Sequence, residues 1–153
     1  MSIYLKLGSI QGSVTTSGFE SWIVLESFQW GFAAGYTAKQ SGSEVSVREV
    51  VMTMRAEKAS PMIVSAGVSR TVLPSAVLKL TTTAKDKVST FMSYEFANCV
   101  ITNYAVSAPV EGPPTETLSL SFTTITETYT PLDSKLTGSP TSVTYDVRSA
   151  KAS

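Results

Sequence analysis

The 153-residue chain contains no histidine and a single cysteine, and these two absences remove most catalytic and metal-binding chemistry. Histidine is the commonest general base, nucleophile activator and metal ligand in proteins. One cysteine, Cys99, can form neither an intramolecular disulfide nor a zinc cluster, and its place in FANCVITNYAV is typical of a small buried apolar residue. No phosphate-cradling GxxxxGK[ST] or GxGxxG motif is present either. The sequence therefore argues against an enzyme, and it predicts no cofactor and no bound metal.

Charge is also scarce, which narrows the possible partners. Charged residues make up 16% of the chain, against about 25% in an average soluble domain. The formal net charge is zero and Lys and Arg form no long cluster, so neither nucleic acid nor a polybasic membrane contact is expected. No run of about 18 apolar residues occurs, and the alternating N-terminus lacks the apolar core of a signal peptide. We expect no membrane insertion and, for a protein that leaves the cell, no cleaved signal.

Two carboxylates and three aromatic residues are the remaining candidates for a small-molecule site. Glu26 and Glu95 interrupt apolar strand patterns and could pair as a glycosidase acid and base, although such acids in a small β domain more often lie at an edge, an interface or a ring lumen. Trp22, Phe28 and Trp30 share one parity of a strand pattern. That parity favours burial in the core over a sugar-stacking platform.

Two-residue alternation dominates the chain and predicts strands. Ile3, Leu5 and Leu7 form a first strand that ends at Gly8. A parity change near Arg48 and Glu49 predicts a β-bulge. The predicted strands cover residues 3–7, 22–30, 45–54, 75–83, 90–98, 99–107, 118–129 and 143–147, and those at 90–98 and 99–107 run almost directly into each other.

One short helix is expected, with Ser60 as its N-cap, Pro61 at its first position and Gly67 at its end. Several short strands with one helix are typical of a mainly β fold, here an antiparallel or two-sheet β-barrel, in a single domain over residues 1–153. A long extended loop from Gly31 to Glu44, without secondary structure of its own, interrupts the strands. Its exposed Phe32 and Tyr36 would need a partner to cover them.

The order of these segments resembles that of the Hcp family, the hemolysin-coregulated proteins of the bacterial type VI secretion system. The similarity extends over nearly the whole chain, from IYLKLGSIQG to YDVRS. It includes an aromatic-x-aromatic-Gly element at residues 28–31, a Val-x-Val strand at 45–47, the strand-to-helix junction EKASP at 57–61, the strand ETLSLSFTTITETYTP at 116–131 and the terminal element TYDVRSA at 144–150.

The resemblance implies a structural subunit that forms homohexameric rings, which stack into a tube and carry or chaperone effectors for export. It also implies the spike protein, the contractile sheath and secreted effectors as partners, with assembly in the bacterial cytoplasm followed by secretion. The loop would be an arm that reaches a neighbouring subunit through Gly31, Phe32, Tyr36, Lys39, Gln40 and Glu44. A phage-like tail-tube subunit and a carbohydrate-binding β-sandwich are the alternatives.

Overall fold

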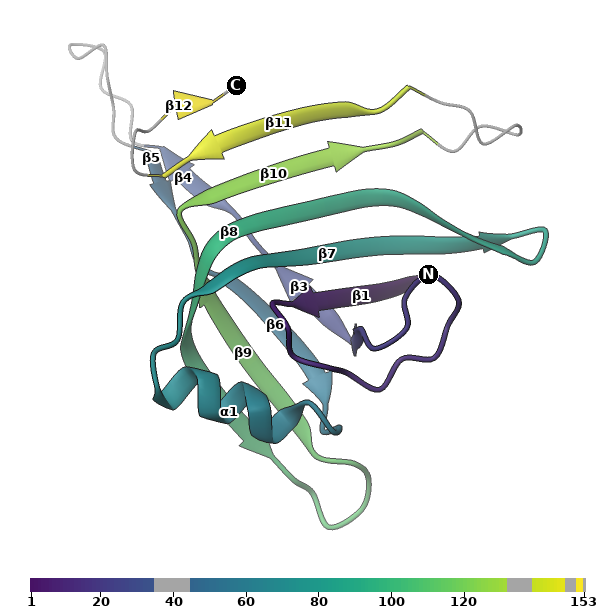
Figure 1. Ribbon diagram of the computed structural model, residues 1–153, viewed down its shortest axis with the longest axis vertical. Coiled ribbons are helices and arrows are strands. Elements are labelled where there is room, and N and C mark those ends of the chain that lie inside the picture. Colours follow the sequence, from purple (N-terminus) through teal and green to yellow (C-terminus); the bar gives the residue numbers. More distant parts are fainter. Residues whose placement is uncertain (35–44, 132–138, 148–150, 153) are drawn as a thin grey trace.

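The computed structural model describes residues 1–34, 45–131, 139–147 and 151–152. Strands dominate it, with a single helix among these residues (Figure 1). The elements are β1 (Ser2–Leu7), β2 (Ile23–Leu25), β3 (Ser27–Gln29), β4 (Phe32–Ala34), β5 (Val45–Val47), β6 (Val50–Arg55), α1 (Ser60–Val68), β7 (Leu73–Ala84), β8 (Lys87–Ser107), β9 (Thr115–Ser121), β10 (Thr124–Tyr129), β11 (Thr141–Asp146) and β12 (Lys151–Ala152).

Two antiparallel sheets share the long strand β8 and together enclose the core. The large sheet has the order β12-β11-β10-β8-β7-β1-β2, and the small sheet has the order β3-β6-β9-β8. Because β2 and β3 are consecutive, the circuit from β1 through both sheets and back closes into a barrel, from which β10, β11 and β12 extend as a flap (Figure 1). The predicted mainly β, two-sheet barrel with one short helix is confirmed.

Strand β8 passes from one sheet to the other at Asn98. Its N-terminal half pairs with β7 and β10, and its C-terminal half pairs with β9. Asn98 has φ +51, a left-handed conformation that Asn adopts more readily than most residues. Its Nδ2 donates to Thr123 Oγ1 at 3.0 Å, and Thr123 Oγ1 in turn donates to the Ala97 carbonyl at 3.2 Å. These bonds fix the corner where the two predicted strands merge.

The strand expected over residues 118–129 is divided in two at the same corner. Leu118 and Leu120 of β9 point inward, whereas Ile125 of β10 has the opposite parity and is also buried. The change occurs at Phe122 and Thr123, where the chain leaves the small sheet for the large one. One residue of slip therefore keeps apolar side chains inside both sheets.

Two other parity expectations need correction for the same reason. Ile23 and Leu25 are buried while Val24 is exposed, so residues 22–25 turn to the core the face opposite to the one that the shared parity of Trp22, Phe28 and Trp30 predicted. The parity changes at Glu26, between β2 and β3, after which Phe28 packs against the core as expected. At Arg48 and Glu49 the chain passes from β5 to β6, which lie in different sheets, so this feature is a break between strands and no β-bulge.

The helix begins one residue earlier than its predicted cap implies. Ala59 is the N-cap and makes no side-chain capping bond, while Ser60 is the first helical residue and Pro61 follows it. The helix continues past Gly67 to Val68. Ile63 is its buried residue, and it lies against the core that the two sheets enclose.

The segment from Gly8 to Trp22 covers the outer side of β1. Phe19 stacks on Tyr4 with ring centroids 4.5 Å apart, and Trp22 contacts Phe19 edge-on at 5.1 Å. Backbone bonds from Gly12 N to the Ser21 carbonyl and from Val14 N to the Trp22 carbonyl close this segment on itself. Trp22 is therefore outside the central core, unlike the prediction, while Phe28 and Trp30 pack against that core.

Candidate interaction surfaces

The base of the predicted arm is a two-stranded ribbon, β4 and β5, which among the described strands pairs with neither sheet (Figure 1). Among the strands that the structure describes, β4 pairs with β5 alone, with Phe32 opposite Val47 and Ala34 opposite Val45. The expectation of a loop without secondary structure from residue 31 onward is therefore wrong for residues 32–34. An isolated ribbon of this size is marginal in water, and Phe32 and Val45 are exposed on it. Some further surface is needed to stabilise it.

The predicted arm residues fall into two groups. Gly31 precedes the ribbon and its carbonyl accepts a bond from Arg48 N at 3.0 Å, while the Phe32 side chain is 61% exposed. Its ring centroid lies 6.3 Å from that of Trp30, whose indole Nε1 is buried without an acceptor among the described residues. Tyr36, Lys39, Gln40 and Glu44 lie outside the residues that the structure describes.

The small sheet has two unpaired edges on opposite sides. β3 pairs with β6 alone, and the C-terminal half of β8, from Val100 to Ser107, pairs with β9 alone among the described strands. Neither edge contains a proline or a lysine, which are residues that commonly prevent pairing with another chain. Both edges are therefore competent to accept a further strand.

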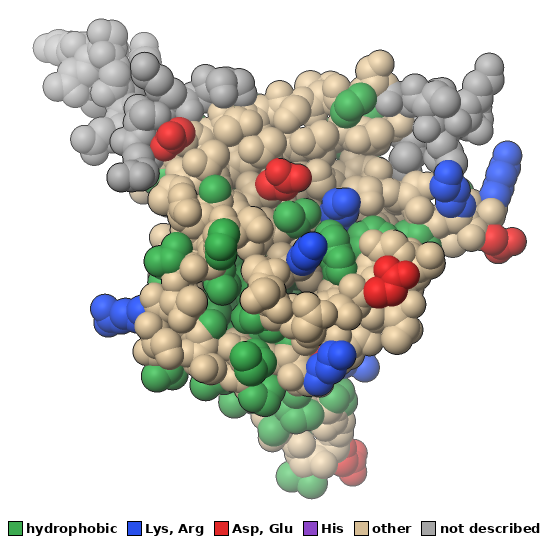
Figure 2. Space-filling model, in the orientation of Figure 1, with side chains coloured by type: hydrophobic (Ala, Val, Ile, Leu, Met, Phe, Trp, Pro, Cys, Tyr) green, Lys and Arg blue, Asp and Glu red, His purple; other side chains and the backbone are tan. Residues whose placement is uncertain are grey.

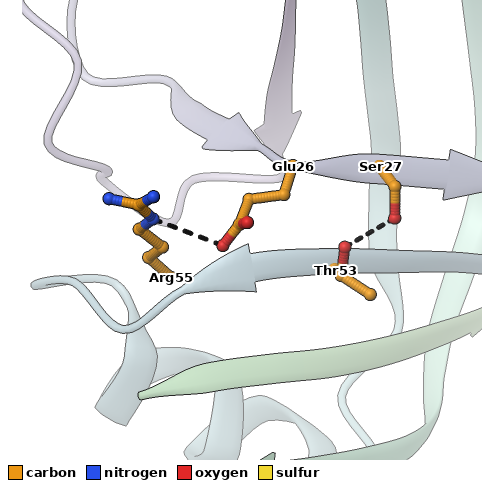
Figure 3. A network of polar contacts seen from close by, with 4 residues as sticks. All are labelled: Glu26, Ser27, Thr53 and Arg55. Atoms are coloured by element: carbon orange, nitrogen blue, oxygen red, sulfur yellow. Dashed lines mark hydrogen bonds and ion pairs between the residues drawn. The ribbon is translucent and has the colours of Figure 1, made fainter. Parts of the chain in front are cut away.

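The outer side of the small sheet is covered by hydroxyl groups, and we call it the hydroxyl face. Ser27, Thr53, Thr117 and Ala105 lie opposite one another across its four strands. Ser27 Oγ and Thr53 Oγ1 are hydrogen-bonded at 2.5 Å (Figure 3). Beside this row, at the end of β6, Arg55 Nε lies 3.4 Å from Glu26 Oε1, so the two charges compensate each other (Figure 3). The face is polar and nearly neutral.

A shallow apolar groove separates α1 from the unpaired edge of β8. Its volume is about 260 Å³, and its lining includes Val64, Gly67 and Val68 of α1 together with Ile101 and Tyr104 of β8. Hydrophobic side chains gather over the lower half of the molecule in Figure 2, where α1 and the β8–β9 connection lie. The exposed ones in this region are Met62, Val64, Val68, Val72, Val106 and Val110.

A buried carboxylate holds α1 against the small sheet. Glu116 of β9 is 1% exposed and accepts hydrogen bonds from Ser60 Oγ at 2.8 Å and from the Tyr104 hydroxyl. Ser60 Oγ also accepts from Glu57 N at 3.0 Å, and Glu57 Oε2 accepts from Ser13 Oγ at 2.6 Å. This network was not predicted from the sequence, although Glu116 shares the inward parity of Leu118 and Leu120. Ser60 contributes here as a bridge to Glu116 and not as a helix cap.

The Tyr104 hydroxyl and the Cys99 thiol both have a raised pKa. Burial and then the hydrogen bond to Glu116 raise the pKa of Tyr104 to about 12. Burial raises the pKa of the Cys99 thiol to about 11, and its Sγ donates to the Phe96 carbonyl at 3.5 Å. A thiol with a raised pKa is a poor nucleophile at neutral pH, which agrees with the structural role expected for this residue.

Glu26 and Glu95, the two carboxylates considered as a catalytic acid and base, lie in different segments with different neighbours. Glu26 is paired with Arg55, and Glu95 is exposed on β8 beside Val77 and Thr126 of the neighbouring strands. No group of three or more His, Cys, Asp or Glu residues that could hold a metal occurs within the described part of the chain. A search of the same residues finds no helix with the length and apolarity that a membrane crossing requires.

The tryptophans do not form an open stacking platform. Trp22 is half-buried, and Lys79 Nζ lies 5.5 Å from the centroid of its ring. Phe28 contacts Tyr94 at 5.1 Å between centroids, and Trp30 packs against the core. Because Trp22 lies outside the core while Phe28 and Trp30 pack against it, the three rings form no common open face, and they give no support to the carbohydrate-binding alternative.

Comparisons with known proteins agree on one family. The family model described as "Type VI secretion system effector, Hcp" matches residues 4–129. No curated protein matches the chain. Three similar solved structures are a type six secretion system protein (24% identity over 99% of both chains, TM-score 0.91), Hcp1 from Salmonella typhimurium (21% over 99% of this chain and 98% of that chain, 0.82) and a type VI secretion system effector from Yersinia pestis (22%, 95% and 99%, 0.78).

The structural matches support the fold, and the family model, which covers most of the chain, supports the family. Hcp proteins are non-enzymatic tube components that type VI secretion systems secrete, so the prediction that the chain is no enzyme is confirmed. The match also agrees with the resemblance seen in the sequence and does not favour a phage-like subunit. The chain belongs to the Hcp family of the type VI secretion system.

Proposed function

We propose that six copies of the chain close head to tail into a ring, that rings stack into a tube, and that effectors pass through it for export. The observation that carries this proposal is the pair of unpaired edges on the small sheet. When the β8 edge of one copy pairs with the β3 edge of the next, each copy uses two different surfaces. Such a heterologous contact closes into a ring if the rotation between subunits fits.

The hydroxyl face is suited to line the lumen of this ring. Continuing the small sheet from copy to copy would place Ser27, Thr53 and Thr117 of every subunit on one continuous surface. Ser27 and Thr53 already bond to each other, and Arg55 already pairs with Glu26. A wall of small hydroxyl groups whose charge is balanced binds passing proteins weakly, which transport requires. The spike protein and the contractile sheath are the further partners that this function implies.

Native mass spectrometry and negative-stain electron microscopy of the purified protein test the proposal. We expect a species of six chains and ring-shaped particles with a central hole, and short stacks at high concentration. Gln29→Lys together with Ala105→Lys places a positive charge on each unpaired edge and should prevent ring formation without unfolding the barrel, because both side chains are exposed. A wild-type protein that remains monomeric at high concentration would refute the proposal.

A further inference from the structure

The groove between α1 and β8 combines three features that suit the docking of a segment from another chain. It follows the unpaired edge of β8, which leaves backbone donors and acceptors available to an incoming strand. Its walls are apolar, with Val64 and Val68 on the helix side and Ile101 on the strand side. It also holds about 260 Å³, enough for a large side chain.

The helix that forms one wall lacks the features of a water-facing helix. None of its residues, SPMIVSAGV, carries a charge. It buries Ile63 on the sheet, yet Val64 is 37% and Val68 81% exposed on its other sides. Apart from Ser60 and Ser65 its residues are apolar or glycine, and a helix with apolar side chains on more than one side is usually covered on more than one side. The outer side of α1 therefore indicates a second contact, and it adjoins the β8 edge that the proposed ring already uses.

The same chain offers a matching segment at the opposite end of the small sheet. Phe32 lies three residues after Gln29, the last residue of β3. Its ring is 61% exposed on an uncharged ribbon, although Trp30 lies on one side of it. An edge-to-edge contact between β3 of one copy and β8 of the next brings the residues that follow β3 to this side of the neighbour. Both surfaces are free of charge, so neither loses an ionic group on contact.

We propose that the groove between α1 and β8 receives Phe32 from the adjacent copy, so that the base of the arm is held between helix and strand of its neighbour. This inference rests on the proposed function and adds to it the contact that determines which subunit surface the arm reaches. Gly67 contributes to the seat, because a Cβ at this position would lie 3.2 Å from Ile101 Cγ2, so the helix lies close to β8 here.

Disulfide trapping between copies tests the contact. Phe32→Cys and Val68→Cys are introduced together into a Cys99→Ala background, and the assembled protein is oxidised and run on a denaturing gel without reductant. We expect a ladder of covalent oligomers that extends beyond the dimer. The matched control joins Phe32→Cys with Val24→Cys, since Val24 is an exposed valine on β2, away from the groove. The control should give no ladder.

The outcomes separate this inference from the function on which it rests. Rings seen by native mass spectrometry, but no ladder from the Val68 pair, would overturn the Phe32 contact and leave the ring intact. An equal ladder from the Val24 pair would overturn it as well. As an independent measurement, Val68→Asp should raise the concentration for half-assembly at least tenfold, with Val110→Asp as the exposed control. Equal effects of these two variants would also contradict the contact.

Discussion

Glu116 joins three elements through one buried carboxylate, and its replacement should therefore cost stability. Glu116→Gln keeps the shape but replaces one of the two acceptor oxygens by an amide donor, which then faces the hydroxyl of Ser60 or of Tyr104 in place of an acceptor. We expect a loss of about 1–3 kcal/mol in the free energy of unfolding, measured by urea denaturation. The control is Glu111→Gln, because Glu111 is exposed in the β8–β9 connection. Equal midpoints for the two variants would show that the network contributes nothing.

The raised pKa of Tyr104 predicts how the stability of the fold depends on pH. Its pKa is about 12 in the folded protein, against about 10 for an unfolded tyrosine. Because the folded state disfavours the phenolate, the stabilisation is complete below about pH 10 and is lost as the pH rises toward 12. The difference in unfolding free energy between the wild type and Tyr104→Phe should shrink over this window. A constant difference from about pH 9 to about pH 11.5 would contradict the raised pKa.

Close backbone packing makes Gly12 sensitive to replacement by alanine, whereas Gly31 should tolerate it. A Cβ on Gly12 would lie 2.2 Å from the Trp22 carbonyl oxygen, whereas a Cβ on Gly31 meets nothing within 4 Å. Gly12→Ala must therefore displace the segment that covers β1, and we expect a loss of roughly 1–3 kcal/mol. Gly31→Ala is the matched control and should leave the thermal midpoint nearly unchanged. The prediction fails if both variants melt together.

At the scale of elements, alternation predicted the strands but not which sheet each one joins. The pattern of Leu118 and Leu120 identified β9 correctly, and Ile3, Leu5 and Leu7 identified β1. The corners at Glu26, at residues 48–49 and at residues 122–123 were read as continuous or bulged strands. A change of sheet and a one-residue slip both reverse parity, so a single sequence cannot separate them. Pairing partners far along the chain decide between the two.

The interaction surfaces were predictable only in part for a related reason. The exposed aromatic residue of the arm base, Phe32, was identified from its place in a long polar segment, and its exposure agrees with that expectation. The groove between α1 and β8 could not be predicted, because it depends on how far the strand extends beyond its pairing with β7. Ser60 was taken for a cap because local spacing does not reveal Glu116, 56 residues later.

At the scale of the whole molecule, pairing of the two free edges between copies predicts that like charges on these edges prevent assembly and that opposite charges allow it. Gln29→Lys with Ala105→Lys should repel across the β3–β8 contact between copies, while Gln29→Lys with Ala105→Glu should assemble more readily. The difference should be larger at low ionic strength, because exposed charges are screened by salt. Light scattering at two salt concentrations measures it. Equal assembly of both variants would show that these edges do not meet.

The central claim is that the chain satisfies its unpaired edges with copies of itself, and native mass spectrometry of the wild-type protein tests it most directly. We expect a dominant species of six chains of 16.3 kDa each, which dissociates when both edges carry lysine. A single-chain species that persists at every concentration and at low as well as moderate salt would contradict it.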